Sequence, residues 1–159
     1  MFTVLLLSSY SLLFAQQKAI DSLLQVLQSA KGEQKLEAIS QLSKHLVDER
    51  NREAYTWIGQ GLDLAEELDN DSIKAQLLKR LGVIHDLDGH TTLAIEHYRA
   101  ALSLGRQAGD SIVAGDVLHN MSMVYRSLGS YEKSLELAFE ALKVDLAIDN
   151  LGGLGYTYN

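Results

Sequence analysis

Apolar and small residues recur along most of this chain at the spacing of amphipathic helices, and one such pattern occurs twice. Within each copy the apolar positions fall at i, i+3 and i+7 and then, beyond a glycine, at i, i+4, i+7 and i+8. This spacing marks one face on each of two successive helices. The first copy consists of Leu78, Leu81, Gly82, His85, Gly89, Ala94, Tyr98, Ala101 and Leu102, and the second of Leu118, Met121, Ser122, Tyr125, Gly129, Ser134, Ala138, Ala141 and Leu142. The unit is a helical hairpin, and its repetition every 40 residues, as at Gly89 and Gly129, predicts an all-α array of antiparallel hairpins.

Weaker versions of the same pattern precede the two clear copies. Ile39, Leu42 and Leu46 fit the first helix of a degenerate hairpin, whose loop near residues 48–50 is one residue shorter than in the clear copies. Counting in repeats divides the chain into a leading helix at 16–32, a degenerate hairpin at 33–70, hairpins at 71–110 and 111–150, and the start of a further repeat at 151–159.

Polar and glycine-containing segments separate the expected hairpins, at 68–71, 108–110 and 148–150. Asp and Asn in such segments adopt left-handed backbone conformations and cap the helix that follows. The sequence therefore predicts turns there. The expected caps are Asp71, Ser72, Asp110 and Ser111.

The two clear copies resemble the tetratricopeptide repeat family. The segments LLKRLGVIHDLDGHTTLAIEHYRAAL and VLHNMSMVYRSLGSYEKSLELAFEAL follow its order of large, Leu, Gly and aromatic residues on the first helix and Ala, aromatic and Ala-Leu on the second. The family's closing proline is absent, and the period exceeds the usual ~34 residues, as in bacterial regulatory members. The resemblance implies a right-handed α-α superhelix, a solenoid that binds proteins and has no catalytic activity or cofactor of its own.

In that family, the first helices of successive repeats line a concave groove that holds a partner peptide or helix. Carrying the groove positions over to this chain predicts a site for a protein or peptide ligand. Its residues are Lys44, Gln76, Lys79, Val83, His119, Asn120, Met123 and Arg126. Lys79 and Asn120 are expected to hydrogen-bond the backbone of an extended peptide, with a solvated surface role as the alternative.

Composition excludes several other classes of function. The chain has 159 residues, 47% hydrophobic content and no cysteine, so that neither disulfides nor a thiolate metal site can form. The net charge is -7 with no basic run, which makes nucleic acid an unsuitable partner because phosphate binding requires clustered Lys and Arg. The absence of proline suits an uninterrupted series of helices.

The two ends of the sequence suggest a larger, exported protein. The first fifteen residues carry no charge and are followed by QQK, which predicts a secretory signal cleaved near Ala15, with a buried first helix as the alternative. Export would place the domain in the periplasm or on the outer face of the cytoplasmic membrane.

Residues 151–159 begin a repeat that is not completed, so we expect a parent protein with more repeats. This parent would be a membrane-tethered bacterial signalling protein, such as a histidine kinase, a cyclase or a transcriptional regulator. A free-standing periplasmic scaffold is the alternative.

One segment imitates a catalytic motif. Residues 82–93 resemble the first motif of haloacid dehalogenase-like phosphatases, in which Asp86 would be the nucleophile and Asp88 the general acid and base, with bound Mg2+. The helical periodicity before Asp86 disfavours this remote alternative, because the motif follows a strand. Gly109-Asp110-Ser111 similarly imitates a hydrolase motif, but helix capping explains it better. The histidines lack paired metal-ligand spacing, with His85 at a core position and His90 and His97 on a turn and an outer face.

Overall fold

A computed structural model describes residues 2–48 and 52–148, with side chains from residue 14 onward. This part of the chain forms seven helices and no strand. The helices are α1 (Phe2–Leu27), α2 (Gly32–Asp48), α3 (Glu53–Glu67), α4 (Asp71–Leu87), α5 (Thr91–Gln107), α6 (Ser111–Ser127) and α7 (Tyr131–Ala147). The predicted all-α solenoid is therefore confirmed.

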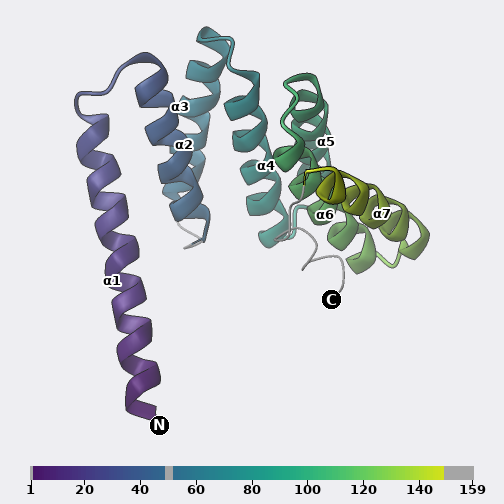
Figure 1. Cartoon of the computed structure of the whole chain (residues 1–159), viewed down its shortest axis with the longest axis horizontal. Coiled ribbons are helices and arrows are strands. Elements are labelled where there is room, and N and C mark those ends of the chain that lie inside the picture. Colours follow the sequence, from purple (N-terminus) through teal and green to yellow (C-terminus); the bar gives the residue numbers. More distant parts are fainter. Residues whose placement is uncertain (1, 49–51, 149–159) are drawn as a thin grey trace.

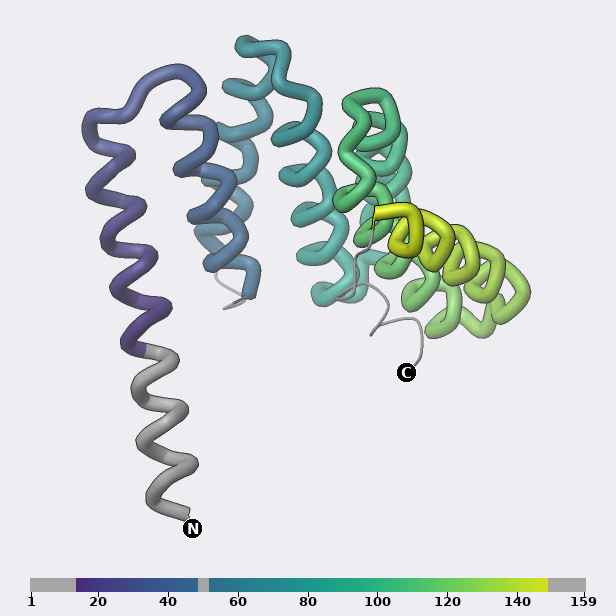
Figure 2. The backbone as a smooth tube through the Cα atoms, in the orientation of Figure 1, coloured from purple at the N-terminus to yellow at the C-terminus, as the bar shows by residue number. Residues whose placement is uncertain are grey.

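The helices stack in chain order as antiparallel hairpins (Figure 1). The pairs α2 with α3, α4 with α5 and α6 with α7 make the hairpins, and the first helices also contact one another, α2 with α4 and α4 with α6. The tube in Figure 2 shows α1 at one end of the array and α7 at the other. Helices α4 and α6 begin 40 residues apart, at Asp71 and Ser111, and so do α5 and α7, at Thr91 and Tyr131. The sequence period is therefore the structural period.

Two apolar clusters form the core. One joins α1 to α4 and includes Leu36, Leu42, Ile58 and Leu77. The other joins α4 to α7 and consists mainly of Ala75, Ala94, Tyr98, Ala101, Leu102, Val113, Val117, Leu118, Met121, Val124, Leu137 and Ala141. The half-buried Val83 on α4 packs against both clusters. Each hairpin thus buries its apolar face only by stacking on its neighbours, as in other repeat proteins.

Small residues set how closely helices approach within a hairpin. Gly82 on α4 faces the buried ring of Tyr98 on α5, and a Cβ atom at Gly82 would lie 2.4 Å from Cε1 of that ring. Real Cβ atoms do not come so near another heavy atom. The ring of Tyr98 therefore fills the space that a larger residue at 82 would need.

Left-handed residues end the helices at the turns. Gly89 has φ 78° and Gly129 has φ 74°, a conformation that favours glycine. After Gly89, the amide of His90 donates to the carbonyl of His85 at 2.8 Å, which closes α4 with a Schellman-type cap. At the equivalent place after α3, Asp69 adopts φ 51° without being a glycine, in line with the turn expected there.

The caps agree with the sequence analysis in part. The carboxylate of Asp110 accepts from the amide of Val113 at 3.0 Å, as predicted. The cap of α4 is Asn70, whose side chain accepts from the amide of Ile73, so the expectation was wrong by one position for Asp71 and by two for Ser72. Ser111 was also expected to be a cap, but it is the first residue of α6. Asp71 is instead the first helical residue, and Ser72 donates to Asp110 at 2.7 Å.

The amino-terminal helix differs from the expected leading helix. Helix α1 runs without a break from Phe2 to Leu27, through the predicted cleavage point at Ala15, and α2 begins at Gly32. Within the described residues, no helix is sufficiently long and apolar to cross a membrane. The side chains of residues 1–13, the loop residues 49–51 and the expected further repeat at 151–159 lie outside the described residues, and the leader stays a prediction.

Candidate functional site

A groove of about 570 Å³ runs across the first helices of the three hairpins, α2, α4 and α6. These helices contact each other directly in the order α2, α4, α6, and their facing side chains form the walls of the groove. The lining residues are Lys44, Val47, Asp48, Gln76, Lys79, Arg80, Val83, Asp110, Ile112, Val113, Asp116, His119, Asn120 and Met123.

Seven of the eight residues predicted from the sequence lie in this groove. Lys44 comes from α2, Gln76, Lys79 and Val83 come from α4, and the α6 residues are His119, Asn120 and Met123. Arg126 is exposed near the end of α6 and is not among the lining residues. The structure thus brings most of the set together, while binding of a peptide there stays a prediction.

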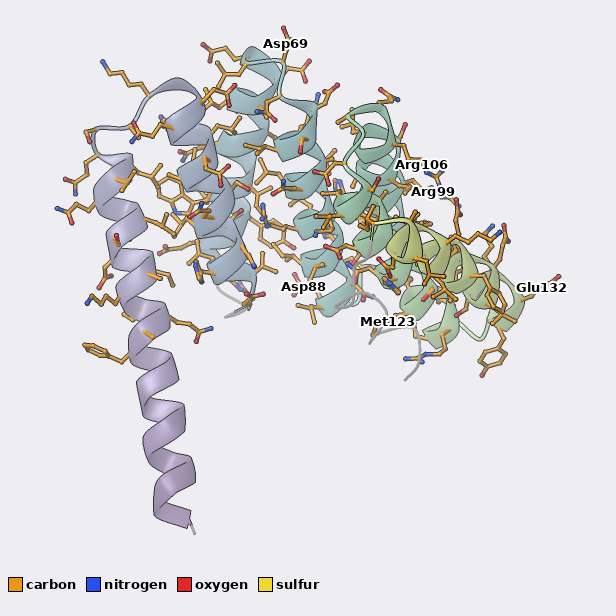
Figure 3. All side chains as sticks on the ribbon, viewed as in Figure 1. Asp69, Asp88, Arg99, Arg106, Met123 and Glu132 are labelled. Carbon is orange, nitrogen blue, oxygen red and sulfur yellow. The ribbon has the colours of Figure 1, made fainter. Side chains whose placement is uncertain are left out.

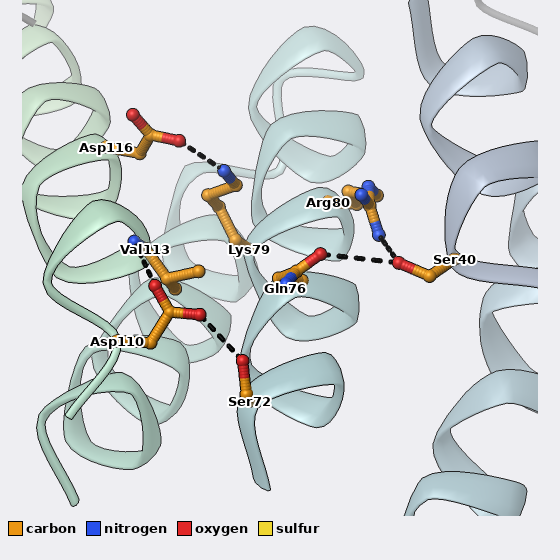
Figure 4. Close-up of polar contacts among 8 residues, drawn as sticks. All are labelled: Ser40, Ser72, Gln76, Lys79, Arg80, Asp110, Val113 and Asp116. Carbon is orange, nitrogen blue, oxygen red and sulfur yellow. Dashed lines mark hydrogen bonds and ion pairs between the residues drawn. The ribbon is translucent and has the colours of Figure 1, made fainter. Parts of the chain in front are cut away.

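Polar contacts cross the groove between neighbouring first helices (Figure 4). The ammonium group of Lys79 lies 2.5 Å from a carboxylate oxygen of Asp116, which ties α4 to α6. On the other side, Ser40 donates to the side-chain oxygen of Gln76 at 3.3 Å and accepts from the guanidinium of Arg80 at 3.0 Å. Lys79, expected to hydrogen-bond a peptide, is therefore paired with Asp116 in this structure.

Arg80 is the groove's most desolvated cation. Its burial lowers the pKa of the guanidinium to about 10, while the nearby carboxylates of Asp48 and Glu37 act in the opposite direction. At neutral pH it stays charged. Its one hydrogen bond among the described residues is donated to the hydroxyl of Ser40, so the guanidinium of Arg80 on α4 points toward α2.

Asn120 stands in the groove with its amide available. Its side chain makes no hydrogen bond within the described part of the chain, and the apolar side chains of Met123 and Val83 line the same groove. An amide both donates and accepts, which matches the alternating groups of an extended peptide backbone. Met123, labelled in Figure 3, is exposed in the carboxyl-terminal half of α6.

His119 differs from the other predicted groove residues because it is buried. Its Nε2 lies 2.7 Å from a carboxylate oxygen of Asp145 on α7, and Asp145 is fully buried. A Cβ atom at Gly115 would come within 3.0 Å of the same carboxylate, so the glycine leaves room for it. His119 therefore joins the second hairpin helix to the first rather than presenting its ring to a ligand.

A second polar cluster lies at the junction of α3, α4 and α5, apart from the groove. The rings of His85 and His97 stack with centroids 5.1 Å apart and planes 7° from parallel. His90 and Tyr55 approach His85 at 5.9 Å and 5.7 Å between ring centroids. From its place in the repeat, His97 was predicted to lie on an outer helix face. That prediction was wrong, because the residue is half-buried and its ring stacks on His85.

Because of this stack, we expect the free energy of unfolding to decrease as the pH is lowered below 6.5. Burial, assisted by the neighbouring His85, lowers the pKa of His97 below its ordinary value of 6.5. Between these two pKa values the unfolded chain binds more protons than the folded one, so the free energy of unfolding decreases as pH falls. Urea denaturation at pH 7.5 and 5.5 measures the loss. A His97→Gln variant should lose part of the dependence, and equal dependence in both proteins would contradict this role of His97.

The phosphatase alternative does not fit the fold. Asp86 lies in α4 and Asp88 is the residue that ends it, so neither follows a strand. Partial burial raises the pKa of Asp86, and Asp88 accepts a hydrogen bond from the hydroxyl of Tyr55 at 3.0 Å. Asp86 thus belongs to the last turn of α4, and Asp88 to the connection between α4 and α5. Among the described residues, no group of three His, Asp or Glu side chains is placed to hold a metal ion.

Several groove residues were missed from the sequence, namely Val47, Asp48, Arg80, Asp110, Ile112 and Val113. Arg80 follows Gln76 by one helical turn, and this i, i+4 spacing could have placed it on the same face. The residues at helix ends, Asp48 and Asp110, carried no such signal because their position depends on how the hairpins stack.

Comparison with known proteins shows a partial relationship. No protein-family model matches the chain. Photosystem I assembly protein Ycf3 of Prochlorococcus marinus strain NATL1A is 29% identical over 89 residues, which are 56% of this chain and 50% of the relative. The same protein of strain NATL2A is 28% identical over the same shares. The chain thus spans about half the length of the curated relatives it matches. This similarity and the seven described helices are together consistent with tetratricopeptide-like repeats.

Proposed function

We propose that this chain is a non-catalytic scaffold that binds an extended segment of a partner protein in the groove of α2, α4 and α6. The observation that carries the proposal is the groove itself, lined by one helix from each of three hairpins. The relatives bear the name of an assembly protein, and assembling a complex requires contact with its subunits.

The chemistry of the groove suits a peptide better than a small metabolite. Its lining combines the apolar side chains of Val47, Val83 and Met123 with polar and charged ones. The charged groups of Lys79 and Asp116 neutralise each other, so the groove attracts neither strong anions nor strong cations at that point. Affinity would come from backbone hydrogen bonds to Asn120 and from apolar pockets for alternate side chains.

Selection from a random peptide library against the full chain tests this function. We expect enriched peptides whose binding, followed by fluorescence anisotropy, weakens about tenfold or more in Asn120→Ala and Met123→Lys, which corresponds to about 1.4 kcal/mol. Leu93→Lys is the matched control, because Leu93 is an exposed apolar residue of α5 outside the groove. Peptides that bind all three variants equally well would contradict the groove as the site.

We also propose that the array is the exported sensory region of a larger bacterial signalling protein. The support is the charge-free segment of residues 1–15 ahead of the first polar run. Fusion of residues 1–30 to a reporter that is active only outside the cytoplasm tests export. An inactive fusion would favour the alternative in which these residues form a buried first helix.

A further inference from the structure

Helix α7 carries a row of exposed apolar side chains on the face turned away from the array. Tyr131 is 71% exposed, Leu135 58%, Phe139 55% and Leu146 59%, and the half-buried Leu142 lies among them. At 100° per residue these five positions fall within an arc of about 80° on the helix surface. We call Tyr131, Leu135, Phe139, Leu142 and Leu146 the α7 row. Contiguous exposed apolar surface of this kind marks an interaction site.

A second face of α7, about 120° around the helix from the α7 row, is already occupied. Leu137, Ala141 and Asp145 are buried against α6. In the preceding hairpin, the counterpart of Leu142 is Leu102, which is buried next to α6, and the counterpart of Leu135 is the half-buried Ile95. Part of the α7 row, at Leu135 and Leu142, thus corresponds to the side of α5 that α6 covers, whereas Arg99 and Arg106, the counterparts of Phe139 and Leu146, are exposed on α5. No described helix follows α7 to cover its row (Figure 1).

The spacing of the α7 row matches a helix that packs against another helix along its length. Leu135, Phe139, Leu142 and Leu146 are separated by four, three and four residues, which is the d, a, d, a spacing of a two-stranded helical seam. In such a seam the charged residues beside the apolar row determine the orientation of the partner helix.

The charges beside the α7 row select an antiparallel copy of the same helix. Glu136 and Lys143 each follow a d position and lie on the same flank of the row, at the e positions. When two α7 helices pair antiparallel, e faces e, so Glu136 of each copy lies opposite Lys143 of the other. A parallel pair would place them against g positions, which hold Ala138 and the buried Asp145. Lys143 makes no ion pair within the described residues, and Glu136 has one exposed pair, to Lys133, of a kind that contributes little.

We propose that two copies of this chain associate through their α7 rows, antiparallel about a two-fold axis, with Glu136 of each copy paired with Lys143 of the other. An interface of this type is self-complementary, since the same patch serves both copies. This inference concerns the surface of α7 and is independent of the groove.

Sedimentation velocity of the full chain over a wide range of concentrations tests the proposal. We expect a species of twice the 17.6 kDa monomer mass that dissociates on dilution. Phe139→Asp should abolish this species, because it buries a carboxylate in the middle of the row. Leu93→Asp is the control on the exposed surface of α5 and should leave the dimer intact. Circular dichroism of each variant verifies that the monomer stays helical.

Charge reversal tests the orientation. Glu136→Lys and Lys143→Glu should each weaken self-association about tenfold or more, since each places like charges opposite each other twice. An equimolar mixture of the two single variants should associate like the original chain, because every pair between them is again of opposite charge. The double variant should also recover.

A chain that is monomeric at all concentrations overturns the proposal. If Phe139→Asp also lowers the stability of that monomer, the α7 row is covered by residues of the same chain. The proposal is equally overturned by a dimer that Phe139→Asp leaves unchanged. Failure of the mixture to associate would overturn the antiparallel arrangement.

Discussion

Replacing Tyr98 with alanine is expected to lower the free energy of unfolding by about 3–5 kcal/mol, as for other large aromatic side chains removed from a core. The ring is 1% exposed and lies between α4 and α5 against Gly82. Burial also raises the pKa of its phenol, which stays neutral at physiological pH. Urea denaturation followed by circular dichroism measures the change, and Tyr98→Phe, which keeps the ring, should cost about 1 kcal/mol or less.

The partner of this ring supplies the decisive control. Gly82→Ala should destabilise the protein by about 1–3 kcal/mol, because its Cβ atom would overlap the ring of Tyr98. In the double variant Gly82→Ala with Tyr98→Ala, the overlap is gone and the alanine methyl fills part of the space. The combined loss should therefore be smaller than the sum of the two single losses. An additive result would mean that the two residues do not limit each other's space.

Replacing His119 with alanine is expected to cost about 3–5 kcal/mol, because it leaves the fully buried carboxylate of Asp145 without the imidazole that lies 2.7 Å away. Asp145→Ala should also destabilise the protein, since the His119 ring then loses its contact with this carboxylate. Both losses appear in the same urea denaturation experiment. His45→Ala serves as the control for removing a histidine from a first helix outside this pair.

A double variant separates the pair from the space it fills. In His119→Leu with Asp145→Leu, two apolar side chains replace the two polar ones, and buried pairs exchanged in this way often lose little stability. We expect the double variant to be more stable than His119→Ala alone. If the double variant is less stable than either single alanine variant, the attraction between His119 and Asp145 exceeds the free-energy cost of removing both groups from water, and the pair stabilises the contact between α6 and α7.

The repeat was readable from the sequence because its physical cause is local. Leu118, Met121 and Val124 recur at helical spacing, and a helix with such a face must bury it. The left-handed positions at Gly89 and Gly129 and the cap at Asp110 also follow from single residues and their backbone preferences. The cap of α4 was misplaced by one residue because Asn70, Asp71 and Ser72 all favour caps, and their order alone does not choose among them.

Polar pairing was not readable from the sequence, because its members are distant in the chain. His119 and Asp145 are separated by 26 residues, and Lys79 and Asp116 by 37. Neither pair has a local signature. The burial of His97 on α5 likewise depends on another helix, because its stacking partner His85 belongs to α4.

The sequence by itself thus determined the helical hairpins and their period of 40 residues, since periodicity acts along one helix at a time, whereas the groove positions on the first helices came from the family resemblance. The tertiary structure alone decided which polar groups in that groove are paired, that His119 is turned toward α7, and that no described residue covers the exposed members of the α7 row. These features depend on the distance and rotation between helices, and these follow from the packing of the side chains between them.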